Sequence, residues 1–130
     1  MRPLSHERAV SRVNETLTTR AASTLAALAK LARAGREMRP HATKAAKLLK
    51  TLGNEPRLMI LCTLVAGPLS VTQLNQRLPL SQAALSQHLG ILRDCGIVAA
   101  TGESQNITYS LTPGIATRLI GLLHEEFCSH

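Results

Sequence analysis

The chain has 130 residues, a formal net charge of +7, and one Phe, one Tyr and no Trp. A chain of this length forms one domain with room for an appendage. With so few aromatic residues its core must consist of Leu, Ile, Val and Ala, which suits packed helices. No stretch approaches the roughly 20 apolar residues of a membrane span. We find no acid–base pair, no nucleophile constellation and no Gly-rich phosphate loop, so we expect neither an enzyme nor a bound cofactor.

Most of the positive charge lies near the start of the chain. Residues 1–40 carry eight Arg and Lys against three Glu, and residues 41–130 carry seven basic against five acidic residues, so the first segment holds +5 of the +7. Such a balance favours DNA or an acidic membrane surface as a partner, with a merely soluble basic protein as the alternative. The Arg-rich start is similar to a mitochondrial presequence, but Glu7 and Glu15 argue against that and against membrane binding. We expect a cytoplasmic protein without a membrane partner.

A long helix is predicted from Ser5 to Met38, because neither Gly nor Pro interrupts it before Gly35 and Pro40. Its apolar stripe requires a partner surface, either a second copy of the helix or the domain that follows. Thr and Ala in the stripe argue against a strong independent coiled coil. We assign residues 1–40 to a basic amphipathic N-terminal helix or arm. The stripe consists of Val10, Leu17, Thr24, Leu31 and Met38, spaced by seven, with Val13, Ala21, Leu25 and Leu28 beside them.

Residues 41–130 are predicted to form a second domain of short helices. One helix closes at Gly53, and the next, "EPRLMILCTLVAG", has Pro in its first turn. A capping box, Ser70-x-x-Gln73, opens a third helix. A tight turn then leads to Ser81, which can cap the helix "QAALSQHLGILRDC".

The pattern changes after Gly96. "IVAATGESQNITYSL" alternates apolar and polar residues on both sides of a turn, which predicts a two-stranded hairpin, and a final helix is predicted over residues 113–128. Two helices joined by a tight turn and followed by a hairpin form a winged helix-turn-helix. We therefore expect a mainly α fold with a small β-hairpin wing, assembled as a helical homodimer with an extra N-terminal helix.

The second helix of the helix-turn-helix carries small polar residues on its outer face. Gln can bond adenine in two places, Ser can bond a base or a phosphate, and Ala can touch a thymine methyl group. An ordinary polar helix face is the alternative reading. Candidate DNA-reading residues are Ser81, Gln82, Ala83, Ser86, Gln87 and His88; candidate phosphate contacts, each equally compatible with a solvated charge, are Lys44, Lys47, Lys50, Arg57 and Arg77.

These stretches resemble the ArsR/SmtB family of winged-helix repressors over about residues 42–128, most specifically in "LSQAALSQHLGILRDCGIV". The resemblance implies a homodimer, paired through its first and last helices, that blocks transcription at operator DNA until an inducer weakens binding. The chain departs from the family pattern in two places. Its wing tip, "TGESQN", carries Glu103 where Arg or Lys is usual, and Pro79 replaces a common Gly in the turn. Contact between the wing and the minor groove is therefore in doubt.

The Cys and His residues of the chain do not follow the metal-site patterns of the family. Metal-sensing members carry Cys pairs on the first helix of the helix-turn-helix or Asp, His and Glu sets on the last helix. The matching stretch here, "LSVTQL", has no thiol, and the chain has no CxxC pair. We expect none of the usual metal sites. One makeshift tetrahedral zinc site remains open, formed by Cys62, Cys128, His124 and His130.

Cys62, inside "MILC", and Cys128, at the end of the last helix, are similar to the thiol pair of the SqrR, BigR and HlyU subgroup. That resemblance implies a response to persulfides and related reactive sulfur species through a disulfide or polysulfide bridge. From the residues alone, Cys62 can equally be a small core residue and Cys128 a bystander. An apolar neighbourhood would raise the pKa of Cys62, so we expect Cys128, aided by His124, to attack first. Cys95 is interpreted as a packing residue.

The function predicted is a DNA-binding repressor that senses reactive sulfur species through Cys62 and Cys128. A metal-ion or general oxidant sensor of the same family is the alternative, and an architectural DNA binder without an inducer is a more distant one. The sequence identifies neither the operator nor the regulated genes.

Overall fold

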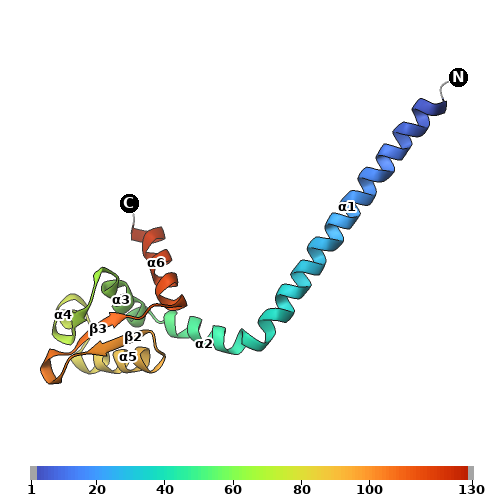
Figure 1. The fold of residues 1–130 in the computed structure, drawn as a ribbon. Coiled ribbons are helices and arrows are strands. Elements are labelled where there is room, and N and C mark those ends of the chain that lie inside the picture. Colours follow the sequence, from blue (N-terminus) through green and yellow to red (C-terminus); the bar gives the residue numbers. More distant parts are fainter. Residues whose placement is uncertain (1–2, 129–130) are drawn as a thin grey trace. The chain divides into compact units, whose positions relative to one another are not determined.

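The computed structural model describes residues 3–128, with side-chain exposure for residues 13–128 except Gln105. The chain separates into two units, Met1–Lys44 and Ala45–His130, and each is described by itself (Figure 1). Within the described residues, no helix combines the length and the apolar character that crossing a bilayer requires.

The first unit is dominated by the long helix α1 (Pro3–Met38). It ends where the sequence predicts, because Pro40 lies in the one-turn 3₁₀ helix η1 (Arg39–His41). The helix α2 (Ala42–Leu52) then begins. All α1 side chains from Val13 to Met38 are exposed in the single chain.

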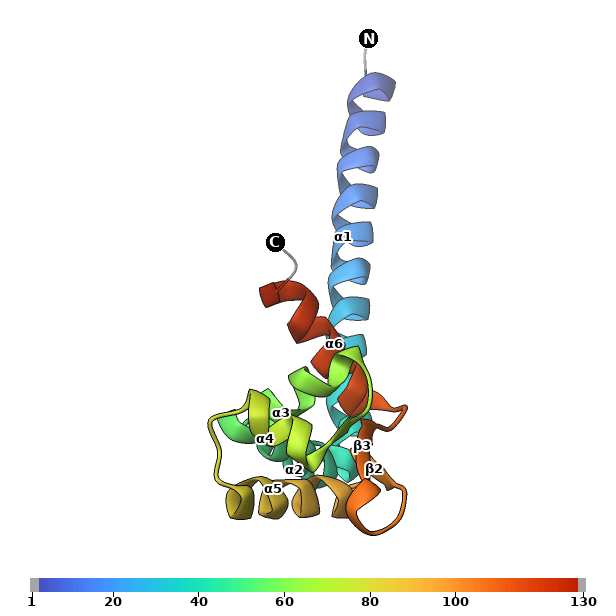
Figure 2. The ribbon, with the colours of Figure 1, turned by 90° about the vertical axis from the view of Figure 1, so that its left-hand side faces the viewer.

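The second unit follows the predicted order of helices, hairpin and helix, and the mainly α winged-helix fold is confirmed (Figure 2). Its elements after α2 are α3 (Glu55–Thr63), η2 (Leu64–Ala66), β1 (Leu69–Ser70), α4 (Val71–Arg77), α5 (Gln82–Asp94), β2 (Val98–Thr101), η3 (Ser104–Asn106), β3 (Thr108–Leu111) and α6 (Ile115–Cys128).

The core of this unit is aliphatic, as the composition requires. Apolar positions three or four residues apart on each helix turn inward, and burying each side chain contributes roughly 1.5–3 kcal/mol. Helix α5 contributes its inner face to this core, since Leu85, Leu89 and Leu92 are at most 1% exposed. The other fully or nearly fully buried residues are Leu52, Ile60, Leu61, Leu64, Leu74, Leu78, Ile97, Val98, Ala116 and Ile120.

The wing is an antiparallel sheet of order β1-β3-β2. The hairpin pairs Val98 with Leu111 and Thr101 with Thr108. The short strand β1 was not predicted; it pairs through Leu69 with Tyr109 and ties the start of α4 to the wing. At the tip, Gly102 has φ 105°, and an added Cβ would lie 2.2 Å from the backbone oxygen of Asn106, so only glycine fits this turn.

Within this unit, α5 and the free end of α6 lie on opposite sides. Figures 1 and 2 show α5 along one side of the sheet and the end of α6 on the other. Helix α3 lies between them, because it packs against both α5 and α6.

Candidate nucleic-acid interface and thiol pair

The helix-turn-helix is formed by α4 and α5, and a serine cap starts each helix. Ser70 and Gln73 form the predicted capping box: the Gln73 backbone N–H donates to Ser70 Oγ (3.1 Å), and the Ser70 N–H donates to Gln73 Oε1 (2.9 Å). Ser81 caps α5 by accepting from the Ala84 N–H at 3.1 Å. The predicted DNA-reading residue Ser81 therefore also has a structural role, although its hydroxyl proton remains available to an acceptor.

The outer face of α5 presents the other predicted DNA-reading side chains together. Gln82, Ala83, Ser86 and Gln87 are exposed, while Leu85 and Leu89 on the opposite face anchor the helix in the core. Short, exposed polar side chains on a firmly packed helix suit insertion into the major groove.

His88 borders this face and is half-buried. Its Nδ1 atom is buried and has no hydrogen-bond partner among the described residues. A buried nitrogen without a hydrogen-bond partner lowers the stability of the fold.

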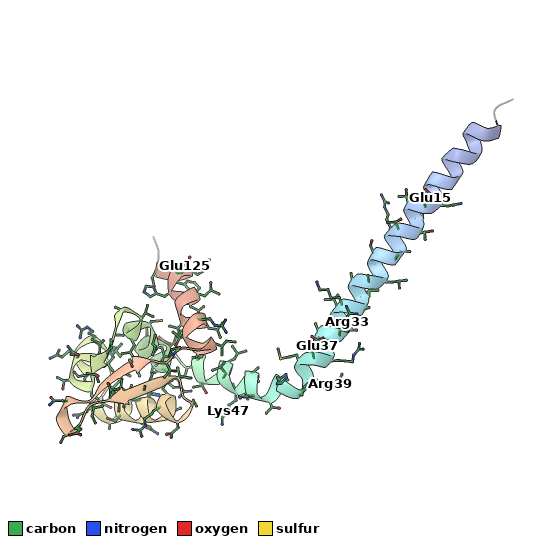
Figure 3. All side chains as sticks on the ribbon, viewed as in Figure 1. Glu15, Arg33, Glu37, Arg39, Lys47 and Glu125 are labelled. Atoms are coloured by element: carbon green, nitrogen blue, oxygen red, sulfur yellow. The ribbon has the colours of Figure 1, made fainter. Side chains whose placement is uncertain are left out.

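Four of the five candidate phosphate contacts differ in their surroundings. Lys44 and Lys47 are exposed on α2, and Figure 3 shows Lys47 pointing outward. Arg77 is exposed, with Nη1 donating to the Gln73 carbonyl at 3.1 Å. Arg57 has a clear structural role, because its Nε donates at 2.9 Å to the Thr51 carbonyl in the last turn of α2. Lys50, weighed beside these four, is also exposed.

Negative charge at the wing tip is exposed. Glu103 lies there, and the strands β2 and β3 carry no Arg or Lys. A wing without positive charge is poorly suited to phosphate, which leaves α5 and its basic surroundings as the candidate DNA interface.

The second candidate site joins two helices that are distant in sequence. Cys62 lies on α3, half-buried at the edge of the core, and Cys128 is the exposed last residue of α6. Helices α3 and α6 pack against each other, and both thiols are free. Burial raises the pKa of the Cys62 thiol, and the negative charge of a Cys128 thiolate raises this pKa further. The two thiols belong to helices that pack against each other.

Metal binding finds little support at this pair. Within residues 3–128, no three His, Cys, Asp or Glu side chains are grouped so that they could hold a metal ion. His130, the fourth ligand of the makeshift zinc site, lies outside the described residues. Cys62, Cys128 and His124 therefore do not amount to a zinc site by themselves.

One thiol prediction is wrong. Cys95 was interpreted as a packing residue, but it is exposed at the C-terminal cap of α5, where its N–H donates to the Ile91 carbonyl at 3.0 Å. Because α5 ends there, its side chain lies outside the core.

Large apolar side chains on the two thiol-bearing helices are exposed, which the sequence did not predict. Leu122 and Phe127 on α6 are 62% and 73% exposed, and Met59 on α3 is 48% exposed. Exposed apolar side chains of this size are candidate contacts for a protein partner. The only Phe of the chain, directly beside Cys128, was the available signal.

Comparison with known proteins identifies the family. Residues 54–100 match the model of the arsR family of bacterial regulatory proteins. The chain is 47% identical to the transcriptional activator HlyU of Vibrio cholerae over 71% of this chain and 85% of that protein. It is 46% identical to the biofilm growth-associated repressor of Agrobacterium fabrum over 71% and 79% of the two chains.

Solved structures agree with this assignment. Reduced HlyU from Vibrio cholerae shares 47% identity and a TM-score of 0.66, covering 71% of this chain and 97% of that one. The transcriptional repressor BigR from Xylella fastidiosa shares 42% identity and a TM-score of 0.66, covering 72% and 93%. With the helix-turn-helix, the wing and these relatives in place, the chain belongs to the arsR family and is a DNA-binding transcriptional regulator.

Proposed function

We propose that this protein is a homodimeric repressor that binds operator DNA through α5 and releases it when reactive sulfur species join Cys62 to Cys128. The observation that carries the proposal is the packing of α3, which holds Cys62, against α6, which ends at Cys128. Among the relatives, one is named an activator and others are named repressors. Of these two roles, repression is the simpler one for a small protein whose described part is helical and DNA-binding.

In the DNA-bound state, α5 lies in the major groove. Gln82 and Gln87 bond base edges, and Ala83 and Ser86 allow close approach, with His88 at the border of this face. Phosphate contacts are made by Lys44, Lys47 and Arg77, with Arg57 contributing through its remaining N–H groups.

Two copies pair through the apolar surface of α6 and the neighbouring helices. Leu122, Phe127 and Met59 are exposed in the single chain and would be covered in the dimer. A dimer presents two copies of α5 to successive major grooves, which accounts for how so short a helix can bind with specificity. The thiol pair lies beside this surface, because Cys128 follows Phe127 directly.

The chemistry follows from the difference between the two thiols. The exposed Cys128 thiolate attacks the outer sulfur of a persulfide R–S–SH, and R–S⁻ leaves as a thiolate. Cys62 takes up sulfur in the same way more slowly, because its raised pKa keeps it largely as a thiol. The terminal sulfur of one persulfidated cysteine then attacks the inner sulfur of the other, releasing HS⁻ and leaving a trisulfide. The free thiols suit a reducing compartment such as the cytoplasm.

Control of DNA binding requires only modest coupling. A bridge between α3 and α6 that favours the non-binding shape by about 3 kcal/mol lowers operator affinity by about two orders of magnitude. The route is short, since α3 contacts both α6 and α5.

The experiment compares glutathione persulfide with hydrogen peroxide on the reduced protein. Thiols are capped afterwards, intact mass is measured, and operator binding is followed on the same samples. We expect a Cys62–Cys128 link containing added sulfur after persulfide, together with loss of DNA binding. A pure disulfide formed equally by both reagents would indicate a general oxidant sensor instead.

Three single substitutions complete the test. Cys62→Ser and Cys128→Ser are expected to bind operator but not to respond, whereas Cys95→Ser, which removes the exposed thiol on α5, responds normally. Free Cys62 and Cys128 with unchanged DNA binding after persulfide would refute the sensing mechanism, and zinc titration would be the next experiment.

A further inference from the structure

The apolar stripe of α1 is uncovered in the single chain. Leu17, Leu28 and Leu31 are 57%, 57% and 69% exposed, and a Cβ added at Gly35 would meet nothing within 4 Å. All side chains of α1 from Val13 to Met38 are exposed in the single chain, so nothing within the described part of this chain covers the stripe.

The spacing of the stripe identifies the kind of surface that covers it. Two rows repeat every seven residues, one containing Leu17, Thr24, Leu31 and Met38, the other Asn14, Ala21, Leu28 and Gly35. A straight helix drifts about 20° per heptad against such a repeat, so only a helix that supercoils around a similar helix keeps both rows covered. A globular partner would instead require the 3.6-residue period.

Charge supports the same assignment. The charged residues Glu15, Arg33 and Glu37 lie outside the two rows and project from α1 (Figure 3). Small residues, Ala27 and Ala34 among them, flank the stripe and allow close approach of a second helix.

We infer that α1 pairs with α1 of a second copy as a parallel, in-register coiled coil, which Thr24 and Ala21 make weak by itself and which forms as part of the dimer. Asn14 favours this register, because a polar residue in one layer of such a seam is satisfied best by the same residue of the partner. Orientation follows from the connection to α2, and here the inference rests on the homodimer proposed above. Only the three residues of η1 separate α1 from α2, whereas α1 is about 54 Å long. Paired DNA-binding domains therefore keep the C-terminal ends of both α1 helices together, as a parallel arrangement requires.

The exposed apolar area of α1, in the two rows and beside them, is large enough to add substantially to a dimer contact. Six large apolar side chains of α1 are at least 54% exposed: Val13, Leu17, Leu25, Leu28, Leu31 and Met38. Covering roughly 100 Å² of each removes about 600 Å² per helix from water, approaching the about 800 Å² per partner of a standard interface.

The test places a single cysteine at a seam or an outer position of the full chain, with Cys62, Cys95 and Cys128 all changed to Ser. Ala21→Cys lies in the seam and Ala26→Cys on the outer side of the same helix. A disulfide needs Cα atoms within about 7 Å. Under mild oxidation we expect Ala21→Cys to form a covalent dimer at least tenfold faster than Ala26→Cys. Circular dichroism checks that both variants are folded.

Other results would overturn the inference. Equal rates for Ala21→Cys and Ala26→Cys, or no covalent dimer, would refute the seam. Linking only in a mixture of Ala21→Cys with Leu28→Cys would show an antiparallel pair and refute the register. Sedimentation of the full chain separates the two proposals: a dimer without seam linking refutes only this inference, and a monomer refutes the homodimer as well.

Discussion

Helices α5 and α1 have comparable apolar patterns but opposite surroundings. On α5, Leu85, Leu89 and Leu92 are at most 1% exposed and belong to the core of the DNA-binding unit. On α1, Leu28 and Leu31 are 57% and 69% exposed. The comparison teaches that periodicity identifies which face of a helix needs covering, whereas the partner that covers it depends on where the chain places the helix.

The largest difference between the two helices is expected in stability. Leu89→Ala leaves a cavity in the core and should lower the free energy of unfolding by about 2–5 kcal/mol. Leu31→Ala, on α1, should leave unfolding of the DNA-binding unit unchanged. Tyr109, the only Tyr in a chain without Trp, lies on β3, so its fluorescence in a urea titration reports this unit alone. Equal losses in the two variants would break the comparison.

The second difference concerns DNA. Gln87→Ala removes an exposed side chain from the outer face of α5 and should cost about 1–3 kcal/mol of discrimination at one adenine of the operator. Gln76→Ala, exposed on α4, is the matched control and should leave base preference unaltered. Binding is measured on operator fragments substituted one base pair at a time. An unaltered preference in Gln87→Ala would exclude that residue from base reading.

A smaller effect sharpens the view that α5 is anchored at its start as well as along its length. Ser81→Ala removes the hydroxyl that accepts from the Ala84 N–H and should cost about 1 kcal/mol of unfolding free energy. Ser86→Ala, on the exposed face of the same helix, should change stability by less than about 0.5 kcal/mol. Thermal melts of both variants measure the difference, and a larger loss in Ser86→Ala would contradict the capping role.

The smallest effect is the pH dependence of stability that arises from a thiol. Only the DNA-binding unit can show it, because α1 carries no Cys. Burial raises the pKa of Cys62, as does the charge of Cys128, so the folded state holds this proton more tightly than the unfolded state. Stability is complete below the ordinary thiol pKa and falls as the pH rises through and above it. Circular dichroism under reducing conditions should show a gentler decline in Cys62→Ala, whereas Cys95→Ala keeps the original slope.

Much of the candidate DNA interface could be predicted from the sequence, because its signals are local. The capping box at Ser70, the cap at Ser81 and the leucines of α5 each lie within a few residues of the feature they specify. The strand β1 was missed, since two residues are too short for a period and their pairing with β3 joins positions far apart in the chain.

By itself, the sequence determined the helices, the wing, the face of α5 that can meet DNA and the candidate thiols, because spacing, caps and turn residues act over short distances. Only the tertiary structure decided that the helices of Cys62 and Cys128 pack together, that Cys95 is exposed and that the stripe of α1 remains uncovered. Cys62 and Cys128 are 66 residues apart in the chain (128 − 62), and the packing of α3 against α6 brings their two helices together. Which apolar faces meet depends on the packing of the whole domain, which no local pattern encodes.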